Sequence, residues 1–271
     1  MMIRPESKPV RRSASLLASM AAVVLATALS SGPSRAQGTD ANRILKTMSE
    51  FIAKQQNVSI AFDSDIEIVT QDLQKIQFAN SGTVLMSRPD KLRVTRTGGY
   101  SHAEVVFDGK AATLLNKDAN VYTRLDAPGN IDQLVERLRQ GYSMTAPGAD
   151  LLVANVFSDL MEEVVDSKHI GLGVIDGVEC EHLAFRTPET DWQIWIQTGD
   201  RPIPRKYIIT SKTMTAAPQY TLRIKEWRTD PQISADSFTF TAPQAAKQVA
   251  VAEFPSADEV PDGVITGGKQ Q

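Results

Sequence analysis

The side chains best suited to chemistry lie in one predicted β-hairpin, residues 168–186, which turns at Asp176-Gly177. Asp-Gly is a strong signal for a two-residue turn, and the pairing that it sets places His169, Cys180 and His182 on one face, with His169 diagonal to His182. Imidazole and thiolate groups bind zinc and copper. No fourth ligand is evident and the spacing fits no standard site. We therefore interpret the three residues as structural and predict neither a metal nor another cofactor.

Another histidine, His102, lies on a predicted strand beside Ser101 and Glu104. These residue types can form a nucleophilic catalyst. Such a catalyst needs its nucleophile on a strained turn, and the sequence contains no Gly-x-Ser-x-Gly. It also contains no His-Glu-x-x-His motif of the kind that binds catalytic zinc. We therefore predict that the protein is not an enzyme.

Two predicted strands in the C-terminal half have an apolar face, because apolar and polar residues alternate along them. The apolar residues are Trp192, Ile194 and Ile196 in the first strand and Tyr220, Leu222 and Ile224 in the second. Two interpretations are open: this surface packs as ordinary core beneath helices, or part of it lines a cavity for an acyl chain. Trp195 has the opposite parity and is expected to be exposed or packed under the C-terminal segment.

Further runs of alternating residues predict two series of strands, from residue 58 to 125 and from 168 to 240. Phe238 and Phe240 are expected to close the second series. The turns between the runs are short, as at Asp108-Gly109, and short turns cannot make the crossovers that parallel strands need. The strands are therefore expected to be antiparallel.

Helical spacing of apolar residues predicts three helices: residues 39–56, 130–141 and 150–166. Asn130 is a suitable N-cap for the second helix, and Gly141 is suited to end it. Asp159, Glu163 and Asp166 would share one face of the third helix. Paired carboxylates can act as acid and base, but we interpret this set as a solvated outer face.

The order helix, strands, helices, strands predicts a mainly β (α+β) fold. We expect a strongly curved antiparallel sheet that forms an open half-barrel, with helices packed on its concave side. No repeat and no interior linker is evident, so residues 37–243 are expected to form a single domain. Residues 244–271 are rich in Ala, Gly and Pro and are expected to form a flexible C-terminal tail.

The first 36 residues have the features of a secretory signal peptide. Arg11-Arg12 precedes an apolar run, residues 16–29, that is too short to span a bilayer, and Ser34-Arg35-Ala36 predicts cleavage after Ala36. A membrane anchor is the alternative. The mature protein is therefore expected to be soluble and periplasmic rather than integral to a membrane. Export could use the general secretory or the twin-arginine route.

Removal of this segment leaves 24 Lys and Arg residues against 31 Asp and Glu residues, a net charge of −7 compared with −3 for the full chain. An acidic protein is a poor partner for nucleic acid and offers no basic face to anionic lipids. Cys180 is the only cysteine, so an exported form has no internal disulfide. Its stability must then depend on its apolar core.

Five segments of the chain form a recognisable set: residues 174–186, Trp192-Gln193-Ile194-Trp195-Ile196, residues 199–206, Ala217-Pro218-Gln219-Tyr220 and residues 88–94. Together they resemble the predicted periplasmic proteins grouped as domain of unknown function 2092. That family is distantly similar to the LolA-like periplasmic lipoprotein carriers, whose fold is an incomplete β-barrel closed by helices. The resemblance implies the same fold here. It assigns no catalytic residue, because the family has none established.

These observations predict a soluble periplasmic protein that binds or carries a hydrophobic ligand, a lipid or a lipoprotein acyl chain, by sequestration. The loop 142–150 would be the hinge of a lid. The alternative is a protein-interaction or sensor module for an envelope protein partner, with a filled interior and no ligand. A cavity of roughly several hundred Å³ would favour the carrier, and a filled interior would favour the module.

Overall fold

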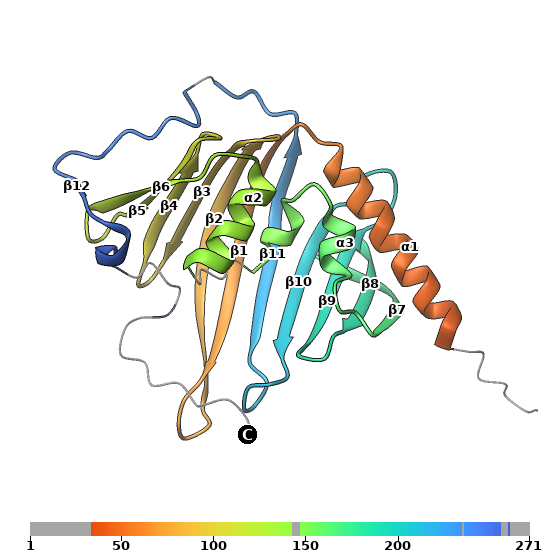
Figure 1. Cartoon of the computed structure of the whole chain (residues 1–271). Coiled ribbons are helices and arrows are strands. Elements are labelled where there is room, and N and C mark those ends of the chain that lie inside the picture. The colour runs from red at the N-terminus through yellow and green to blue at the C-terminus, as the bar shows by residue number, and fades with distance from the viewer. Residues whose placement is uncertain (1–33, 143–146, 235, 256–259, 261–271) are drawn as a thin grey trace, which may run out of the picture. The chain divides into compact units, whose positions relative to one another are not determined.

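The structure, a computed structural model, describes residues 34–142, 147–234, 236–255 and 260. These described residues belong to one compact unit. In its described part the strands make one sheet of the order β12-β6-β5-β4-β3-β2-β1-β11-β10-β9-β8-β7 (Figure 1). Neighbouring strands are antiparallel except β12 and β6. Two meanders therefore meet where β1 pairs with β11.

The first meander consists of β1 (Asn57–Val69), β2 (Lys75–Ser87), β3 (Lys91–Gly98), β4 (His102–Phe107), β5 (Ala111–Asn116) and β6 (Val121–Asp126). The second consists of β7 (Asp166–Ile175), β8 (Val178–Arg186), β9 (Thr190–Gln197), β10 (Pro204–Ser211) and β11 (Gln219–Thr229), and the short β12 (Lys247–Gln248) follows. The helices are α1 (Ser34–Ala53), α2 (Ile131–Tyr142) and α3 (Val156–Leu160), with short 3₁₀ helices η1 (Ala149–Leu151) and η2 (Val251–Glu253).

The helices α2, η1 and α3 lie against one face of the sheet (Figure 1), and α1 packs against β7 and α3. This arrangement confirms the predicted fold class. The protein is mainly β, with a strongly curved antiparallel sheet that forms an open half-barrel and carries helices on its concave side.

Helix α1 joins the core through one apolar face. Ala41, Leu45, Met48 and Ile52 are fully buried, and their spacing of three and four residues places them on the same side of the helix. Burying a side chain of the size of Leu, Met or Ile contributes about 1.5–3 kcal/mol. The helix therefore closes the β7 side of the core. It ends at Ala53, three residues before the predicted end.

Residues 150–166 do not form the single helix that their spacing predicts. Residues 151–153 are all buried, and three consecutive residues cannot all face the sheet from one regular helix. The chain instead makes η1 and then a break at Asn155, which has φ −104° and ψ 48°, before α3. In this break the carboxylate of Asp132 accepts a hydrogen bond of 3.0 Å from the backbone N–H of Ala154.

The acidic helix face predicted for this segment is consequently wrong. Asp159 lies in α3, Glu163 follows the helix with φ 56°, and Asp166 begins β7. Burial raises the pKa of Asp159, and the nearby charges of Asp150 and Asp132 add to this effect. The three carboxylates therefore have separate environments.

Phe238 and Phe240 do not form a strand, contrary to the prediction. Phe238 is buried in a turn-rich segment after β11, and the ring of Phe240 lies 5.0 Å from the ring of Tyr122 in β6. Arg93 of β3 donates a hydrogen bond of 2.8 Å to the carbonyl oxygen of Ser237. Side chains, rather than a backbone ladder, thus anchor this segment to the sheet.

The segment predicted to be a flexible tail, residues 244–271, begins with residues that contact the sheet. Lys247 and Gln248 form β12 alongside β6, and the N–H of Val249 donates to the carbonyl oxygen of Tyr122 at 2.9 Å. Residues beyond 255, apart from residue 260, lie outside the described part. The predicted signal peptide also lies outside it, except for residues 34–36, where α1 begins.

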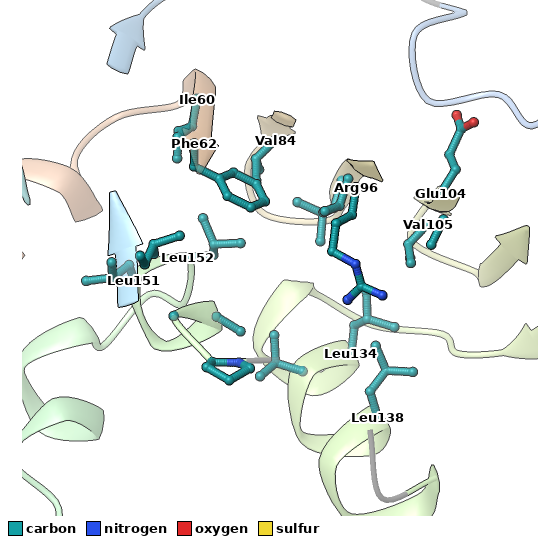
Figure 2. A pocket seen from close by; sticks show the side chains of 18 of the residues that line it. Ile60, Phe62, Val84, Arg96, Glu104, Val105, Leu134, Leu138, Leu151 and Leu152 are labelled. Carbon is teal, nitrogen blue, oxygen red and sulfur yellow. The ribbon is translucent and has the colours of Figure 1, made fainter. Parts of the chain in front are cut away.

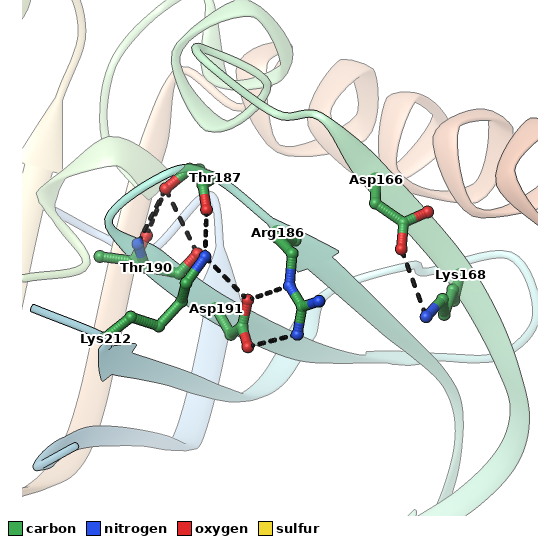
Figure 3. Close-up of polar contacts among 7 residues, drawn as sticks. All are labelled: Asp166, Lys168, Arg186, Thr187, Thr190, Asp191 and Lys212. Carbon is green, nitrogen blue, oxygen red and sulfur yellow. Dashed lines mark hydrogen bonds and ion pairs between the residues drawn. The ribbon is translucent and has the colours of Figure 1, made fainter. Parts of the chain in front are cut away.

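A polar cluster closes the β8–β9 hairpin (Figure 3). Nε and Nη2 of Arg186 donate to the two carboxylate oxygens of Asp191 at 2.7 and 2.9 Å. The hydrogen bond from Arg186 lowers the pKa of Asp191. Lys212 donates to the carbonyl oxygen of Thr187 at 2.6 Å and lies 3.8 Å from Asp191. The cluster fixes the first two residues of β9, Thr190 and Asp191, which precede Trp192.

Candidate functional site

A cavity of about 290 Å³ lies between the helix-bearing face of the sheet and the segment that contains α2 and η1. Figure 2 shows side chains from both sides that point into it. Its lining is mostly apolar and includes Ile60, Phe62, Val84, Leu92, Val94, Val105, Leu114, Leu134, Val135, Leu138, Leu151, Leu152, Tyr220, Leu222, Ile224, Trp227 and Phe254. A concave apolar surface with few polar groups is typical of sites for small molecules.

The sheet side of the cavity follows from strand alternation. In β3, Val94 and Arg96 line the cavity, whereas Thr95 lies on the opposite face, where its hydroxyl is 2.6 Å from that of Thr83. Val94 pairs with Val84 of β2 and with Val105 of β4. These three valines form a continuous apolar row across the sheet.

The helix side of the cavity is positioned by a capping box at the start of α2. The side chain of Asn130 accepts a hydrogen bond from the backbone N–H of Gln133, and the side chain of Gln133 accepts one from the backbone N–H of Asn130, both at 2.9 Å. Leu134 and Leu138, one turn apart, face the cavity from this helix (Figure 2).

Gly148 brings the chain onto the cavity wall just before η1. Its φ is +88°, and a Cβ at this position would lie 2.8 Å from Cδ2 of Leu222. Only glycine combines this conformation with so close an approach. Of the predicted hinge loop 142–150, residues 143–146 lie outside the described part of the chain.

Two charged side chains of the lining, Glu104 and Arg139, form ion pairs with residues outside the lining. The carboxylate of Glu104 points away from the cavity (Figure 2) and accepts from Arg93 at 2.7 Å, with Lys117 at 3.1 Å. Burial alone would raise the pKa of Glu104, but the hydrogen bonds from Arg93 and Lys117 outweigh it and hold this pKa below its ordinary value. Arg139 donates to Asp150 at 2.8 Å.

Two further side chains of the lining, Arg96 and Trp227, carry hydrogen-bond donors. The guanidinium group of Arg96 extends from β3 toward Leu134 and Leu138 (Figure 2). The indole N–H of Trp227, a buried side chain, has no hydrogen-bond partner within the described residues. The polar groups of the cavity are therefore mainly donors.

The structure places the six residues predicted to bind a ligand in two different settings. Tyr220, Leu222 and Ile224 of β11 line the cavity. Trp192, Ile194 and Ile196 of β9 are buried in the main hydrophobic core and are not part of the lining. The ring of Trp192, for example, stacks on Phe185 at 4.0 Å. The binding role of these six residues stays a prediction.

Sequence reasoning missed the lining residues of the first meander and of α2. The available signal was the parity of β3, in which Arg96 has the same parity as the apolar residues Leu92 and Val94. A charged residue on an apolar face requires a structural or functional partner. That signal distinguishes Arg96 from the other basic residues of the meander.

The hairpin with the histidines and the cysteine turns at Asp176-Gly177 as predicted, but its residues do not share one face. A β-bulge between His169 and Gly171 shifts the register by one residue, so His169 contacts Glu181, with Nε2 2.6 Å from a carboxylate oxygen. His182 and Cys180 lie on the other face. Within the described residues, no group of three or more His, Cys, Asp or Glu side chains could hold a metal ion.

The opposite face of this hairpin is occupied by stacked side chains. The ring of His182 stacks on Trp195 at 4.1 Å, and Nε2 of His182 lies 2.9 Å from the side-chain oxygen of Gln193. Lys206 lies 5.2 Å from the centre of the Trp195 ring. Burial lowers the pKa of His182. Trp195 is therefore half-buried beneath its neighbours on the sheet, which differs from both of its predicted settings.

His102 has a structural partner as well. Its Nδ1 lies 2.8 Å from one carboxylate oxygen of Asp118, and its backbone N–H donates to the other at 2.8 Å. Its neighbour Ser101 is buried. The two contacts of His102 with Asp118 connect β4 to the turn after β5. This arrangement explains the histidine as a hairpin contact.

None of the helices in the described ranges has both the length and the apolar character needed to cross a membrane. A comparison with curated proteins found no match. Among solved structures, the chain is similar to an uncharacterized conserved protein from Thermus thermophilus, with 11% identity and a TM-score of 0.43 over 78% of this chain and 99% of that chain.

Two further solved structures are similar in the same way. For the lipoprotein LppX of Mycobacterium tuberculosis the identity is 12% and the TM-score 0.37, over 72% of this chain and 98% of that chain. For the complex of MucA and MucB from Pseudomonas aeruginosa the identity is 12% and the TM-score 0.42, over 75% of this chain and 62% of that chain.

Residues 41–252 match a protein family described as "Predicted periplasmic protein (DUF2092)". The match includes both meanders, the helices between them and all of the cavity lining except Phe254. It covers most of the chain and agrees with the motifs that the sequence presents. The chain therefore belongs to this family of predicted periplasmic proteins.

Proposed function

We propose that the protein is a soluble periplasmic binding protein that takes up a hydrophobic ligand, a lipid or a lipoprotein acyl chain, in the cavity between the sheet and α2. The observation that carries this proposal is the cavity itself. It is lined by apolar side chains from six strands and from α2 and η1, and a volume of about 290 Å³ remains among them. An interior filled by its own side chains would have no such volume.

The size and the lining of the cavity support a single acyl chain as the ligand. Sites for small molecules usually measure about 300–1,000 Å³, and this cavity is at the lower end. Each buried methylene group contributes about 0.8 kcal/mol, so a chain of several methylene groups would bind with useful affinity.

The proposed mechanism is sequestration, in which no bond is made or broken and no cofactor takes part. The polar groups around the cavity support this view. Glu104 and Arg139 are held in ion pairs at 2.7 and 2.8 Å, so neither is positioned to transfer a proton to a bound chain. The protein acts by removing apolar surface from water.

The proposed location is the periplasm, after export and cleavage following Ala36. Helix α1 begins at Ser34, so this cleavage would remove only the first three residues of the helix. The buried residues of α1 begin at Ala41 and would remain. The mass of the mature protein recovered from the periplasm tests this step directly.

The function is tested by native mass spectrometry of the protein purified from its own periplasm, followed by solvent extraction. We expect a discrete adduct that extracts as a lipid. Val94→Phe places an aromatic ring in the middle of the valine row and should abolish the adduct. Thr97→Phe, on the exposed opposite face of the same strand, is the matched control and should keep it. A bare protein that takes up no offered lipid would contradict the proposal.

A second candidate function, a protein-interaction module, is favoured by a different observation. Strand β7 ends the sheet in the described part of the chain, and Ile170, Leu172 and Val174 on it are 54%, 64% and 68% exposed. An exposed apolar edge strand can pair with an extended segment of another envelope protein. Site-specific crosslinking from position 172 in intact cells tests it: a discrete crosslinked protein that persists in Val94→Phe would favour the module.

A further inference from the structure

We propose that Phe254 closes one end of the cavity and thereby sets the maximum length of the acyl chain that the protein binds. This inference rests on the proposed function, because it concerns the ligand of the same cavity. Phe254 is then a specificity residue: a chain that just reaches its ring fills the cavity, and a longer chain does not fit.

The cavity runs across the sheet rather than along one pair of strands. Its lining comes from six strands that are consecutive in the sheet: β11, β1, β2, β3, β4 and β5. Neighbouring strands lie about 4.8 Å apart, so the six together span roughly 24 Å. An extended acyl chain laid across them has its two ends near β11 and β5.

Phe254 belongs to the β5 end of this row of strands. It directly follows η2, which contacts β6, the strand beside β5. Figure 1 shows this short dark-blue helix at the end of the sheet that β5 and β6 form. Among the described residues that follow β11, Phe254 alone lines the cavity. The C-terminal segment therefore contributes one aromatic ring to the cavity, at its β5 end.

Backbone contacts hold Phe254 in this place. Strand β12 pairs with β6, and the N–H of Val249 donates to the carbonyl oxygen of Tyr122 at 2.9 Å. The N–H of Phe254 then donates to the carbonyl oxygen of Val251 at 3.2 Å. Side chains three residues apart in a 3₁₀ turn lie on the same side, and those of Val251 and Phe254 both pack against the main hydrophobic core.

The sheet continues beyond the end that Phe254 closes. Leu114 of β5 lines the cavity, and its register partner on β6 is Thr123. Register partners of an antiparallel pair point to the same face, so Thr123 is in position to extend the lining by one strand. Thr123 is instead only 2% exposed and lies outside the lining. Removal of the Phe254 ring should therefore lengthen the cavity toward β6.

The test measures how the saturated fatty acids from decanoate to eicosanoate bind to the full-length mature protein after lipid removal. Calorimetry below the micelle-forming concentrations provides the affinities. The affinity should rise by about fourfold for each added methylene group up to a limiting chain length and then stop rising. In Phe254→Ala this limit should move to longer chains by roughly two to four carbon atoms, because one more strand spacing adds about 4.8 Å.

Phe254→Trp enlarges the side chain and should move the limit to shorter chains, an effect that a loss of stability does not produce. Phe240→Ala is the matched control, because Phe240 lies in the same C-terminal segment and packs on Tyr122 outside the lining. It should keep the wild-type limit. An unchanged limit in both Phe254 variants, or a loss of affinity by the same factor at every chain length, would overturn the inference. Failure of the wild-type protein to bind any of these fatty acids would instead overturn the proposed function.

Discussion

The ring of Phe62 lies directly over Gly82 on the neighbouring strand. The two residues are register partners in β1 and β2, and a Cβ placed on Gly82 would come within 2.4 Å of Cζ of Phe62. The register of β1 with β11 shifts between Ala61 and Phe62, because β11 has an extra residue, Lys225, at this point, whereas the pairing of β1 with β2 is regular at Gly82. The missing side chain of Gly82 thus lets an aromatic ring form part of the cavity wall.

Gly82→Ala should destabilise the protein by about 1–3 kcal/mol, the usual cost of adding a methyl group to a well-packed site. The new Cβ would contact the Phe62 ring and would also lie 2.5 Å from the carbonyl oxygen of Thr95. Urea denaturation measures the change. Gly99→Ala is the matched control, because a Cβ there meets no atom within 4 Å, and it should change the stability by less than about 0.5 kcal/mol.

A double variant separates the two contacts. Phe62→Ala removes the ring, so Gly82→Ala should cost less in that background than in the wild-type protein, and the remainder reports the clash with Thr95. If Gly82→Ala costs the same in both backgrounds, the ring of Phe62 does not lie over Gly82 in solution.

Strand parity predicted most of the sheet, because alternation is a local property of the sequence. It could not predict which part of the sheet the helices leave uncovered. Trp192 on β9 and Leu222 on β11 belong to strand faces that are equally apolar in sequence. Trp192 nevertheless lies in the filled core, whereas Leu222 lines the cavity. That difference depends on where α2, η1 and α3 lie against the sheet, which tertiary packing decides.

The face of His169 could not be predicted for a related reason. A β-bulge adds one residue to a strand, and every residue beyond it changes face. The backbone feature that accompanies the bulge is the φ of +125° at Gly171. A sequence alone does not reveal this angle. The turn at Asp176-Gly177 was predictable because it depends on those two residues alone.

Glu104→Gln should lower the stability at neutral pH by about 1–2 kcal/mol, since it removes charged hydrogen bonds with Arg93 and Lys117. The pKa of Glu104 in the folded protein is below its ordinary value of 4.5. The stabilisation is therefore fully present above pH 4.5 and is lost as the pH falls through the lower, folded pKa. Urea denaturation at a series of pH values should show the two proteins converging only in this acid range. A constant difference across it would contradict the ion-pair explanation.

His182→Gln should reduce the pH dependence of stability in a higher range. Burial lowers the pKa of His182 from its ordinary 6.5, so the unfolded chain takes up a proton before the folded protein does. The stability contributed by the neutral ring is present above pH 6.5 and is lost as the pH falls through the folded pKa. Tryptophan fluorescence during denaturation, to which the stacked Trp195 contributes, provides the measurement. His102→Gln is the matched control. If both variants keep the wild-type pH dependence below pH 6.5, burial of His182 does not control it.

Cys180 should be chemically inert in the folded protein. Its side chain is fully buried on the face of β8 that carries His182. Burial raises the pKa of its thiol above the ordinary 9.0, so very little thiolate exists at pH 8, and the thiolate is the reactive form. Because opening of the structure must precede reaction, a thiol reagent should label the native protein slowly and the urea-unfolded protein rapidly, with one label per chain.

Gly82→Ala, if it destabilises as expected, should speed the native reaction, whereas Gly99→Ala should not. Rapid labelling of the native wild-type protein would show instead that the β8–β9 pairing opens readily, and the hairpin would then be the first part of the sheet to separate.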